Sequence, residues 1–432
     1  MISYPINNGI KGQPKILGDK SISHRSIIIP AISNGICEIT NLLKSEDVLM
    51  TLEAFRCMGV KILEQNNKII IFGKGLNSLK KPENEIYLGN SGTSARLLTG
   101  LLASQKFNSV LKGDESLSKR PMKRISEPLS LMEANIKTNN GKLPLFIRGK
   151  NLKPSNIDLK IPSAQIKSGL ILASLHIDGE TNLTEHKITR DHTEIMLKSF
   201  GAKIQTEKFE NKKKIKILGN NELIPRNIEV PNDLSSSAFF IVAALINKKS
   251  NILLKDINNN PTRNGLLLAL KKMGAKITFS NNRISNNECV CDIKVSTSQL
   301  NGCELGPEFA DLMIDEYPIL AVAACFAKGP SIFRGLAELR VKESDRLKLI
   351  LINLKNCGVE CKVVDNDLYI NPSSDYIINN SIIRTDYDHR IAMAFSVMAT
   401  RIGKLEIKQS EAINTSFPNF KEEFNKVGGR IS

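Results

Sequence analysis

The sequence has no tryptophan and few aromatic residues of any kind. Aromatic side chains make up 5% of its 432 residues, whereas the formal net charge is +16 at pH 7. A charge of this sign suits acidic partners, such as nucleic acid, anionic membrane surfaces or polyanionic small molecules. Proteins that bind single-stranded nucleic acid usually stack the bases on aromatic side chains. The composition therefore argues against a nucleic-acid binder and leaves that function as an alternative only.

Long hydrophobic runs are also missing. The longest apolar stretches, near residues 238–246 and 317–327, fall short of the ~18 residues that a membrane-spanning helix needs. The start of the chain, Met1-Ile2-Ser3-Tyr4-Pro5, has neither the basic segment nor the apolar core of a secretory signal. We therefore expect a cytoplasmic protein that does not interact with membranes.

Metal and nucleotide motifs are incomplete in this sequence. None of the eight cysteines forms a Cys-x-x-Cys pair, and only five histidines are present, so no zinc site is expected. The glycines at 73 and 75 lack the third glycine of a dinucleotide-binding loop, because residue 78 is serine. The sequence predicts no metal and no cofactor.

What the chain does contain is an internal repeat. A helical pattern, a glycine and a short strand recur in this order at five places, with the glycines at Gly59, Gly201, Gly274, Gly358 and Gly428. A sixth, degraded copy reads Ala134-Asn135-Ile136-Lys137, with Asn135 in the place of the glycine. Glycine or asparagine at this point is typical of a helix that ends on a left-handed residue. Six copies leave 72 residues for each.

Each copy also carries a strand and a second helix upstream. The strand-like runs are residues 37–40, 109–111, 182–184, 251–254, 331–333 and 404–407. The upstream helices, such as 238–245 and 319–326, are apolar all round, so they should be buried at the centre of a domain. Several copies continue downstream as a hairpin, for example around Asn66-Asn67. The repeat is therefore a βαβαββ-type unit.

Six such units are too many for one core, and two domains of three units fit the usual domain size. The third unit ends near residue 228, and Pro231 follows, so we predict a crossover near 230–231. The fold class is α/β (α+β) with two domains. The segment before Gly18 fits either domain by pattern alone.

Cations and hydroxyl groups gather where the predicted helices begin. Lys20, Ser21 and Arg25 open the first buried helix, and a helix N-terminus with Lys and Ser is suited to bind an anion. The other helix starts supply further candidates: Gly92, Arg120, Ser163, Gln165, Arg190, Lys342, Arg346 and Arg390. Surface salt bridges explain any single one of them. Their recurrence in both halves indicates an anionic ligand clamped between two domains.

Two carboxylates stand beside these cations. Asp315 opens the fifth buried helix, and Glu343 lies between Lys342 and Arg346. An aspartate at a helix start is usually an N-cap. The cationic surroundings make Asp315 and Glu343 candidates for proton transfer as well.

Four segments together resemble one family. They are Asp19-Lys20-Ser21-x-Ser23-x-Arg25, residues 89–93 (Gly-Asn-Ser-Gly-Thr), residues 340–347 (Arg-Val-Lys-Glu-Ser-Asp-Arg-Leu) and residues 388–393 (Asp-His-Arg-Ile-Ala-Met). The chain is similar over essentially its whole length to EPSP synthase, the 3-phosphoshikimate 1-carboxyvinyltransferase of the shikimate pathway of aromatic amino-acid biosynthesis. The resemblance implies domains of residues 19–230 and of 1–18 plus 231–432, closing over the active site.

The resemblance also implies the reaction and its residues. The enolpyruvyl group of phosphoenolpyruvate would be added to the 5-hydroxyl of shikimate 3-phosphate, and elimination would release phosphate. The substrates together carry roughly −5 to −6 charges at neutral pH, which calls for many cations. Shikimate 3-phosphate would be held by Lys20, Ser21, Arg25, Ser163, Gln165, Arg190, Asp315 and Lys342. Phosphoenolpyruvate would be held by Lys20, Gly92, Arg120, Gln165, Arg346 and Arg390.

Within the same resemblance, Asp315 would take the hydroxyl proton, and either Glu343 or Lys20 would protonate the methylene carbon. The sequence departs from the family pattern at Thr415, where some members have lysine, and at Ala164, where some have a second serine. Glyphosate is expected to inhibit, and a monomer is expected. The nearest alternative is the related transferase for UDP-N-acetylglucosamine, which commonly uses a loop cysteine that residues 116–121 lack.

Overall fold

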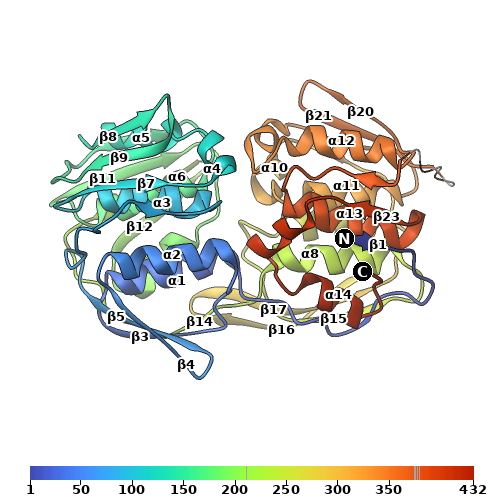
Figure 1. The fold of residues 1–432 in the computed structure, drawn as a ribbon, viewed down its shortest axis with the longest axis horizontal. Helices are drawn as coiled ribbons and strands as arrows, with labels where there is room; N and C mark the ends of the chain where they lie inside the picture. The colour runs from blue at the N-terminus through green and yellow to red at the C-terminus, as the bar shows by residue number, and fades with distance from the viewer. Residues whose placement is uncertain (211, 374–375, 377, 379) are drawn as a thin grey trace. The chain divides into compact units, whose positions relative to one another are not determined.

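The computed structural model describes residues 1–210, 212–373, 376, 378 and 380–432 (Figure 1). The chain folds into two compact halves. The N-terminal half is Gly18–Val230 with Ser285–Glu288, and the C-terminal half is Met1–Leu17, Pro231–Ile284 and Cys289–Ser432. The domains predicted from the sequence change over at 18–19 and 230–231 and do not include the exchange of Ser285–Glu288, which nothing in the sequence pattern indicates.

Three mixed sheets build the N-terminal half. Its strands are β3 (Asn34–Thr40), β4 (Lys61–Gln65), β5 (Lys68–Lys74), β6 (Ile86–Tyr87), β7 (Asn108–Lys112), β8 (Asn135–Asn139), β9 (Lys142–Arg148), β10 (Asn156–Leu159), β11 (Glu180–Glu185), β12 (Lys203–Phe209), β13 (Lys212–Leu218) and β14 (Ile228–Glu229). The strand orders are β14-β3-β5-β4, β6-β7-β9-β8 and β10-β11-β13-β12. In each sheet the first pair is parallel and the other pairs are antiparallel.

The C-terminal half has two four-stranded sheets and one three-stranded sheet. Its strands are β1 (Ile2–Ser3), β2 (Lys11–Gly12), β15 (Asn251–Asn258), β16 (Ile277–Ser285), β17 (Glu288–Ser296), β18 (Glu304–Leu305), β19 (Ser331–Phe333), β20 (Glu360–Val364), β21 (Asp367–Asn371), β22 (Ile382–Ile383) and β23 (Leu405–Ile407). The orders are β16-β17-β15-β2, β18-β19-β21-β20 and β1-β23-β22. Five of the six predicted strand runs lie entirely within strands, the sixth (404–407) begins one residue before β23, and the predicted βαβαββ-type repeat is confirmed.

Segments far apart in the sequence complete three of the repeats. Strand β14, at the end of the third repeat, pairs in parallel with β3 of the first. Strand β2 pairs in parallel with β15, and β1 pairs antiparallel with β23, while Ser3 bridges Ile431 at the chain end. The first 17 residues therefore supply strands to the fourth and sixth repeats, which explains why their local pattern does not assign them.

The predicted helix ends are present in all six repeats. Gly59, Gly201, Gly274, Gly358 and Gly428 have φ between 77° and 107°, the left-handed region that favours glycine. The residue after each glycine donates its N–H to the carbonyl five residues before it.

In the degraded copy the left-handed residue is Glu133, with φ 64°, and Ala134 N–H reaches Leu129 O in the same way. The prediction that Asn135 takes the place of the glycine is wrong. Asn135 is the first residue of β8.

Helices of both halves are labelled in Figure 1. The N-terminal half has α1 (Lys20–Ala31), α2 (Glu46–Cys57), α3 (Gly92–Ala103), α4 (Glu115–Lys119), α5 (Lys123–Ser130), α6 (Ala164–Ser174) and α7 (His192–Ser199). The C-terminal half has α8 (Leu234–Ile246), α9 (Gly265–Lys272), α10 (Glu308–Met313), α11 (Tyr317–Cys325), η1 (Ala337–Val341), α12 (Arg346–Asn356), α13 (His389–Ile402), η2 (Ser410–Thr415) and α14 (Phe420–Lys426). Every residue of α8 and of α11 is buried, as predicted for central helices.

Close packing of the inner helices leaves no room for side chains at some positions. A Cβ atom added to Gly100 of α3 would lie 1.9 Å from the carbonyl oxygen of Gly169 in α6. The two backbones therefore touch, and this fixes the starts of α3 and α6 relative to each other. Among the described residues, no helix combines the length and the apolar character needed to cross a membrane.

Candidate active site

The first group of predicted residues lies at the start of α1 in the N-terminal half. Asp19 caps the helix, because its Oδ1 accepts the N–H of Ile22 at 2.9 Å. Lys20 is the first helical residue, and its ammonium forms an ion pair with Asp47 of α2. Ser21 follows it. The helix start and a fixed cation are thus placed together, as the sequence predicts for an anion site.

Arg25, one turn further along α1, is 3% exposed. Its Nε donates to Thr193 Oγ1 at 2.6 Å, Nη1 to the Ser21 carbonyl at 2.7 Å and Nη2 to Ser168 Oγ at 2.7 Å. Burial lowers the pKa of Arg25 to about 10, and the carboxylate of Glu194 offsets only part of that effect. The guanidinium is therefore a desolvated cation held by neutral oxygens.

The second group surrounds the start of α3. Gly92 is its first residue after the cap Ser91. A Cβ at Gly92 would lie 2.9 Å from Arg120 Nη1 and 3.0 Å from Arg96 Nη1. Arg120 donates from Nη2 to Asn90 Oδ1 and is 7% exposed. Two guanidinium groups therefore lie close to Gly92 at this helix start, where they add to the positive end of the helix dipole.

Hydrogen bonds connect the start of α6 to the start of α3. Ser163 caps α6, with its Oγ 3.4 Å from the N–H of Ile166. Gln165 accepts a hydrogen bond from Arg96 Nη1 at 2.5 Å and donates one to Thr93 Oγ1 at 2.9 Å. Arg96 is not among the residues predicted from the sequence. Its signal is the spacing, since Arg96 follows Gly92 by four residues just as Arg25 follows Ser21.

Behind these helix starts lies a buried charge cluster. Lys167 of α6 pairs with Glu185 at 3.0 Å and with Glu194 of α7 at 2.9 Å, and Lys213 also contacts Glu194 at 3.0 Å. Burial lowers the pKa of Lys167, but the two carboxylates outweigh it and the pKa is raised. Lys167 is 0% exposed, so this cation belongs to the protein interior.

Arg190 lies two residues before the start of α7 at His192. His192 Nδ1 is 2.7 Å from Glu288 Oε1, and both side chains are buried. Glu288 belongs to the four-residue segment that is part of the N-terminal half. The sequence pattern gives no indication of this partner, because Glu288 stands 96 residues further along the chain.

In the C-terminal half, one arginine forms hydrogen bonds with both predicted carboxylates. Arg346, the first residue of α12, is 1% exposed and donates to Asp388 Oδ2 at 2.7 Å, to Asp315 Oδ1 at 3.1 Å and to Glu343. Burial lowers the pKa of Arg346, but the charges of these three carboxylates outweigh it and raise the pKa. These contacts bring Asp315, Glu343 and Arg346 together.

Asp315 does not cap a helix. The N-cap of α11 is Glu316, and no side chain accepts its capping hydrogen bond. Asp315 instead lies between two cations, 3.1 Å from Arg346 Nη1 and 3.2 Å from Lys342 Nζ. The capping interpretation is therefore wrong, and the carboxylate is part of the cationic cluster.

Arg390, at the start of α13, reaches the same region through a different partner. Its Nη1 is 3.8 Å from Glu316 Oε1, which also accepts from Ser235 Oγ and lies 3.7 Å from Arg263 Nη2. Glu316, Arg263 and Ser235 are not predicted from the sequence. Ser235 and Arg263 belong to the fourth repeat, whose first helix has no cation at its start. Asp388 caps α13 and holds Arg346 at the same time.

The two departures from the family pattern lie at helix ends. Thr415 is the last residue of η2, and its Oγ1 donates to the Ala412 carbonyl at 2.8 Å and lies 3.4 Å from His389 Nδ1. Ala164 is the first residue of α6. Neither side chain carries a charge.

The candidates for each ligand occur in both halves. Of those for shikimate 3-phosphate, Asp315 and Lys342 lie in the C-terminal half, and Lys20, Ser21, Arg25, Ser163, Gln165 and Arg190 lie in the other. Of those for phosphoenolpyruvate, Arg346 and Arg390 lie in the C-terminal half, and Lys20, Gly92, Arg120 and Gln165 lie in the other.

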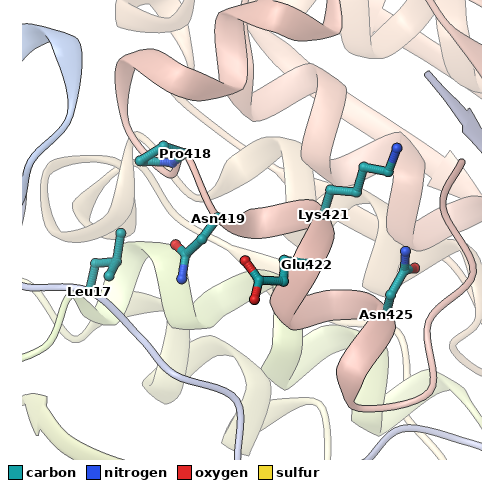
Figure 2. A pocket seen from close by; sticks show the side chains of 6 residues that line it. All are labelled: Leu17, Pro418, Asn419, Lys421, Glu422 and Asn425. Carbon is teal, nitrogen blue, oxygen red and sulfur yellow. The ribbon is translucent and has the colours of Figure 1, made fainter.

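A separate shallow pocket opens in the C-terminal half (Figure 2). It is lined by Leu17, Pro418, Asn419, Lys421, Glu422 and Asn425. No predicted site residue lines it, and its one cation stands beside an anion, so it does not have the chemistry of a phosphate site. Among the described residues, no three His, Cys, Asp or Glu side chains are grouped to hold a metal ion.

Comparison with known proteins gives a consistent result. The model of the EPSP synthase (3-phosphoshikimate 1-carboxyvinyltransferase) family matches residues 6–424. The 3-phosphoshikimate 1-carboxyvinyltransferase of Ruthia magnifica is 46% identical over 98% of this chain and 97% of its own length. That of Vesicomyosocius okutanii is 45% identical over 100% of this chain and 99% of its own.

Solved structures agree. An EPSP synthase from Acinetobacter baumannii superposes with a TM-score of 0.87 at 43% identity, covering 100% of this chain and 99% of the other. The enolpyruvyl transferase NikO from Streptomyces tendae, at 16% identity and a TM-score of 0.79, shares the fold. The chain belongs to the EPSP synthase family and is a transferase, a 3-phosphoshikimate 1-carboxyvinyltransferase of the shikimate pathway.

Proposed function

We propose that the two charged clusters described above carry out this family's reaction. The carboxyvinyl group of phosphoenolpyruvate is transferred to the 5-hydroxyl of shikimate 3-phosphate, and phosphate is released. The observation that carries the proposal is Asp315, a carboxylate fixed between Lys342 and Arg346 at 3.2 and 3.1 Å. A proton acceptor beside cations is what an alcohol attacking an anionic substrate requires.

Shikimate 3-phosphate binds chiefly to the helix starts of the N-terminal half. Arg25 supplies a buried cation held by neutral oxygens, and Lys20 and Ser21 supply an ammonium and a hydroxyl one turn away. Ser163, Gln165 and Arg190 add polar groups from α6 and from the start of α7. Asp315 and Lys342 complete the set from the C-terminal half. Arg25 has lost most of its contact with water, so an anionic substrate group beside it forms a charge-assisted hydrogen bond.

Phosphoenolpyruvate binds where Gly92 leaves the start of α3 open. Arg120 lies within 2.9 Å of the space that a Cβ at Gly92 would occupy, so the guanidinium and the helix N–H groups face one small volume. Gln165 and Lys20 supply further donors, and Arg346 and Arg390 are the contributions of the C-terminal half. Crowding two anionic substrates against each other costs Coulomb energy, and these cations offset it.

The proton steps follow from the charges. Asp315 contacts Lys342 at 3.2 Å and Arg346 at 3.1 Å, and its carboxylate is the group that accepts the proton of the attacking hydroxyl. Glu343, bonded to Arg346, and Lys20, paired with Asp47, are the two candidates for protonating the methylene carbon. Addition gives a tetrahedral intermediate with a new methyl group, and its collapse removes a proton from that methyl group and expels phosphate, which restores the carbon–carbon double bond. The reaction uses no metal or cofactor.

The remaining expectations belong to the same proposal. The protein acts as a monomer in the cytoplasm, does not bind nucleic acid, and is inhibited by glyphosate at the phosphoenolpyruvate site. The neutral Thr415 supplies no cation beside that site.

Phosphate release tests the proposed function. Purified protein with shikimate 3-phosphate and phosphoenolpyruvate should release phosphate only when both are present. No release from folded protein would contradict the proposal, and UDP-N-acetylglucosamine would then replace shikimate 3-phosphate in the same assay. Steeply salt-dependent binding of DNA or RNA would instead favour the nucleic-acid alternative.

A further inference from the structure

Two hydroxyl groups outside the predicted site hold the guanidinium of Arg25. Thr193 Oγ1 accepts from Nε, and Ser168 Oγ accepts from Nη2. The two oxygens are themselves 2.6 Å apart, and both side chains are buried. With the Ser21 carbonyl they occupy three of the five guanidinium N–H groups. The remaining N–H groups and the charge are then available to a ligand.

The direction of these hydrogen bonds is fixed by chemistry. A guanidinium has only donors, so both hydroxyl oxygens must accept from it. Ser168 Oγ also lies 2.6 Å from the carbonyl of Ala164, which can only accept. The Ser168 proton therefore points to Ala164, and the Thr193 proton points to Ser168. A single arrangement satisfies every group, and it holds the guanidinium in one plane.

The buried charge cluster fixes the two hydroxyls. Ser168 follows Lys167 in α6, and Thr193 precedes Glu194 in α7. The 2.9 Å ion pair between Lys167 and Glu194 joins the two helices at the residues next to the hydroxyl contact. Because both ions are almost fully buried, water screens their attraction little. The distance between Thr193 and Ser168 is thereby set independently of any ligand.

We propose that Thr193 and Ser168 are positioning residues that orient Arg25 toward the anionic substrate shikimate 3-phosphate. The inference rests on the proposed function, since it assigns that substrate to Arg25. A carboxylate in the place of either hydroxyl would neutralise Arg25 and repel the substrate. Two neutral acceptors orient the guanidinium and leave its charge for the ligand.

Thr193→Val tests the inference, because valine keeps the shape and removes the hydroxyl. We expect the KM for shikimate 3-phosphate to rise about tenfold, the size of one lost hydrogen bond to a charged group. The KM for phosphoenolpyruvate should stay within about twofold. Thr193→Ser, which restores the hydroxyl, should bring the shikimate 3-phosphate KM back toward the wild-type value. Calorimetric titration with shikimate 3-phosphate alone should show the same weakening.

Thr99→Val is the matched control. Thr99 is a buried threonine of α3 whose hydroxyl donates to the Ala95 carbonyl. Its variant should lose similar stability and keep both KM values. If Thr193→Val does not fold, Ser168→Ala removes the other hydroxyl and should show the same selective rise.

Three results would overturn the inference. One is an unchanged shikimate 3-phosphate KM in a folded Thr193→Val or Ser168→Ala variant of an active protein. Another is an equal rise in both KM values that Thr193→Ser does not reverse, which is what a purely structural role produces. The third is a wild-type protein without turnover on the two substrates, which would remove the proposed function and the inference with it.

Discussion

Two buried arginines near helix starts have opposite kinds of hydrogen-bond acceptor, neutral in one case and charged in the other. Arg25 in the N-terminal half is held by two hydroxyls and a carbonyl, whereas Arg346 in the C-terminal half donates to three carboxylates. Burial lowers the pKa of both, but only at Arg346 do the carboxylates reverse the shift and raise it. The repeats therefore supply two kinds of buried cation. In the part of the chain that the structure describes, no carboxylate is hydrogen-bonded to Arg25, whereas three carboxylates neutralise Arg346.

This difference suits Arg25 to ligand binding and Arg346 to the cluster proposed for proton transfer. Arg25 is stabilised further only when an anion arrives, so its desolvation favours ligand binding. The charge of Arg346 is compensated by the protein's own carboxylates, and its hydrogen bonds hold Asp315 and Glu343 in addition to its proposed contact with phosphoenolpyruvate. The comparison predicts that substitutions in the two clusters change different quantities.

The largest effect is expected at Asp315. Asp315→Asn keeps the shape and removes the proton acceptor, so kcat should fall by roughly 10²- to 10⁴-fold. The dissociation constant of shikimate 3-phosphate should change far less, because the proposed site takes most of its residues from the N-terminal half. Phosphate release and calorimetry measure the two quantities. Asp311→Asn, in the preceding helix α10, is the control, and a kcat drop of the same size there would contradict the assignment.

The next largest effect is a difference in protein stability between substitutions of the two arginines. Arg346→Met leaves three carboxylates around a buried gap and should cost about 3–5 kcal/mol of unfolding free energy, the usual result of breaking a buried ion pair. Arg25→Met removes a desolvated cation, and Thr193 and Ser168 still bond to each other, so its cost should stay below about 1 kcal/mol. Urea unfolding measures both. Equal losses would show that the hydroxyl-bound and carboxylate-bound arginines do not differ.

Gly92→Ala should produce a smaller, selective change in the N-terminal cluster. The new Cβ would lie 2.9 Å from Arg120 Nη1 and 3.0 Å from Arg96 Nη1, so both guanidinium groups must move. We expect the KM for phosphoenolpyruvate and the inhibition constant of glyphosate to rise about tenfold, or roughly 1.4 kcal/mol. The KM for shikimate 3-phosphate is the internal control. An unchanged glyphosate constant would count against the placement of its site at Gly92.

Features fixed by local patterns could be predicted from the sequence. The glycine at each helix end needs a left-handed backbone, and the apolar helices need burial, so the six repeats can be found without a structure. The cations at helix starts are local in the same sense. The wrong capping assignment of Asp315 shows the limit, because the cap is decided by where the backbone enters the helix, one residue later at Glu316.

Contacts between repeats could not be predicted in this way. Arg96 and Gln165 are 69 residues apart, and His192 and Glu288 are 96 apart. The first pair depends on how closely α3 and α6 pack, where Gly100 and Gly169 leave no room for a side chain. Spacing along one helix carries no information about a partner from another repeat. The spacing indicates Arg96 itself but not its contact with Gln165.

The smallest expected effect is on the melting temperature, through the left-handed helix end at Glu133. This residue has a φ of 64° where the other five copies have glycine, and a side chain costs energy in that conformation. Glu133→Gly and Glu133→Ala both remove the contacts of the carboxylate with Lys150 and Lys153, so their difference isolates the backbone. The glycine variant should melt about 2–4 °C above the alanine variant. Equal melting temperatures would show that this copy does not have the left-handed helix end of the other repeats in solution.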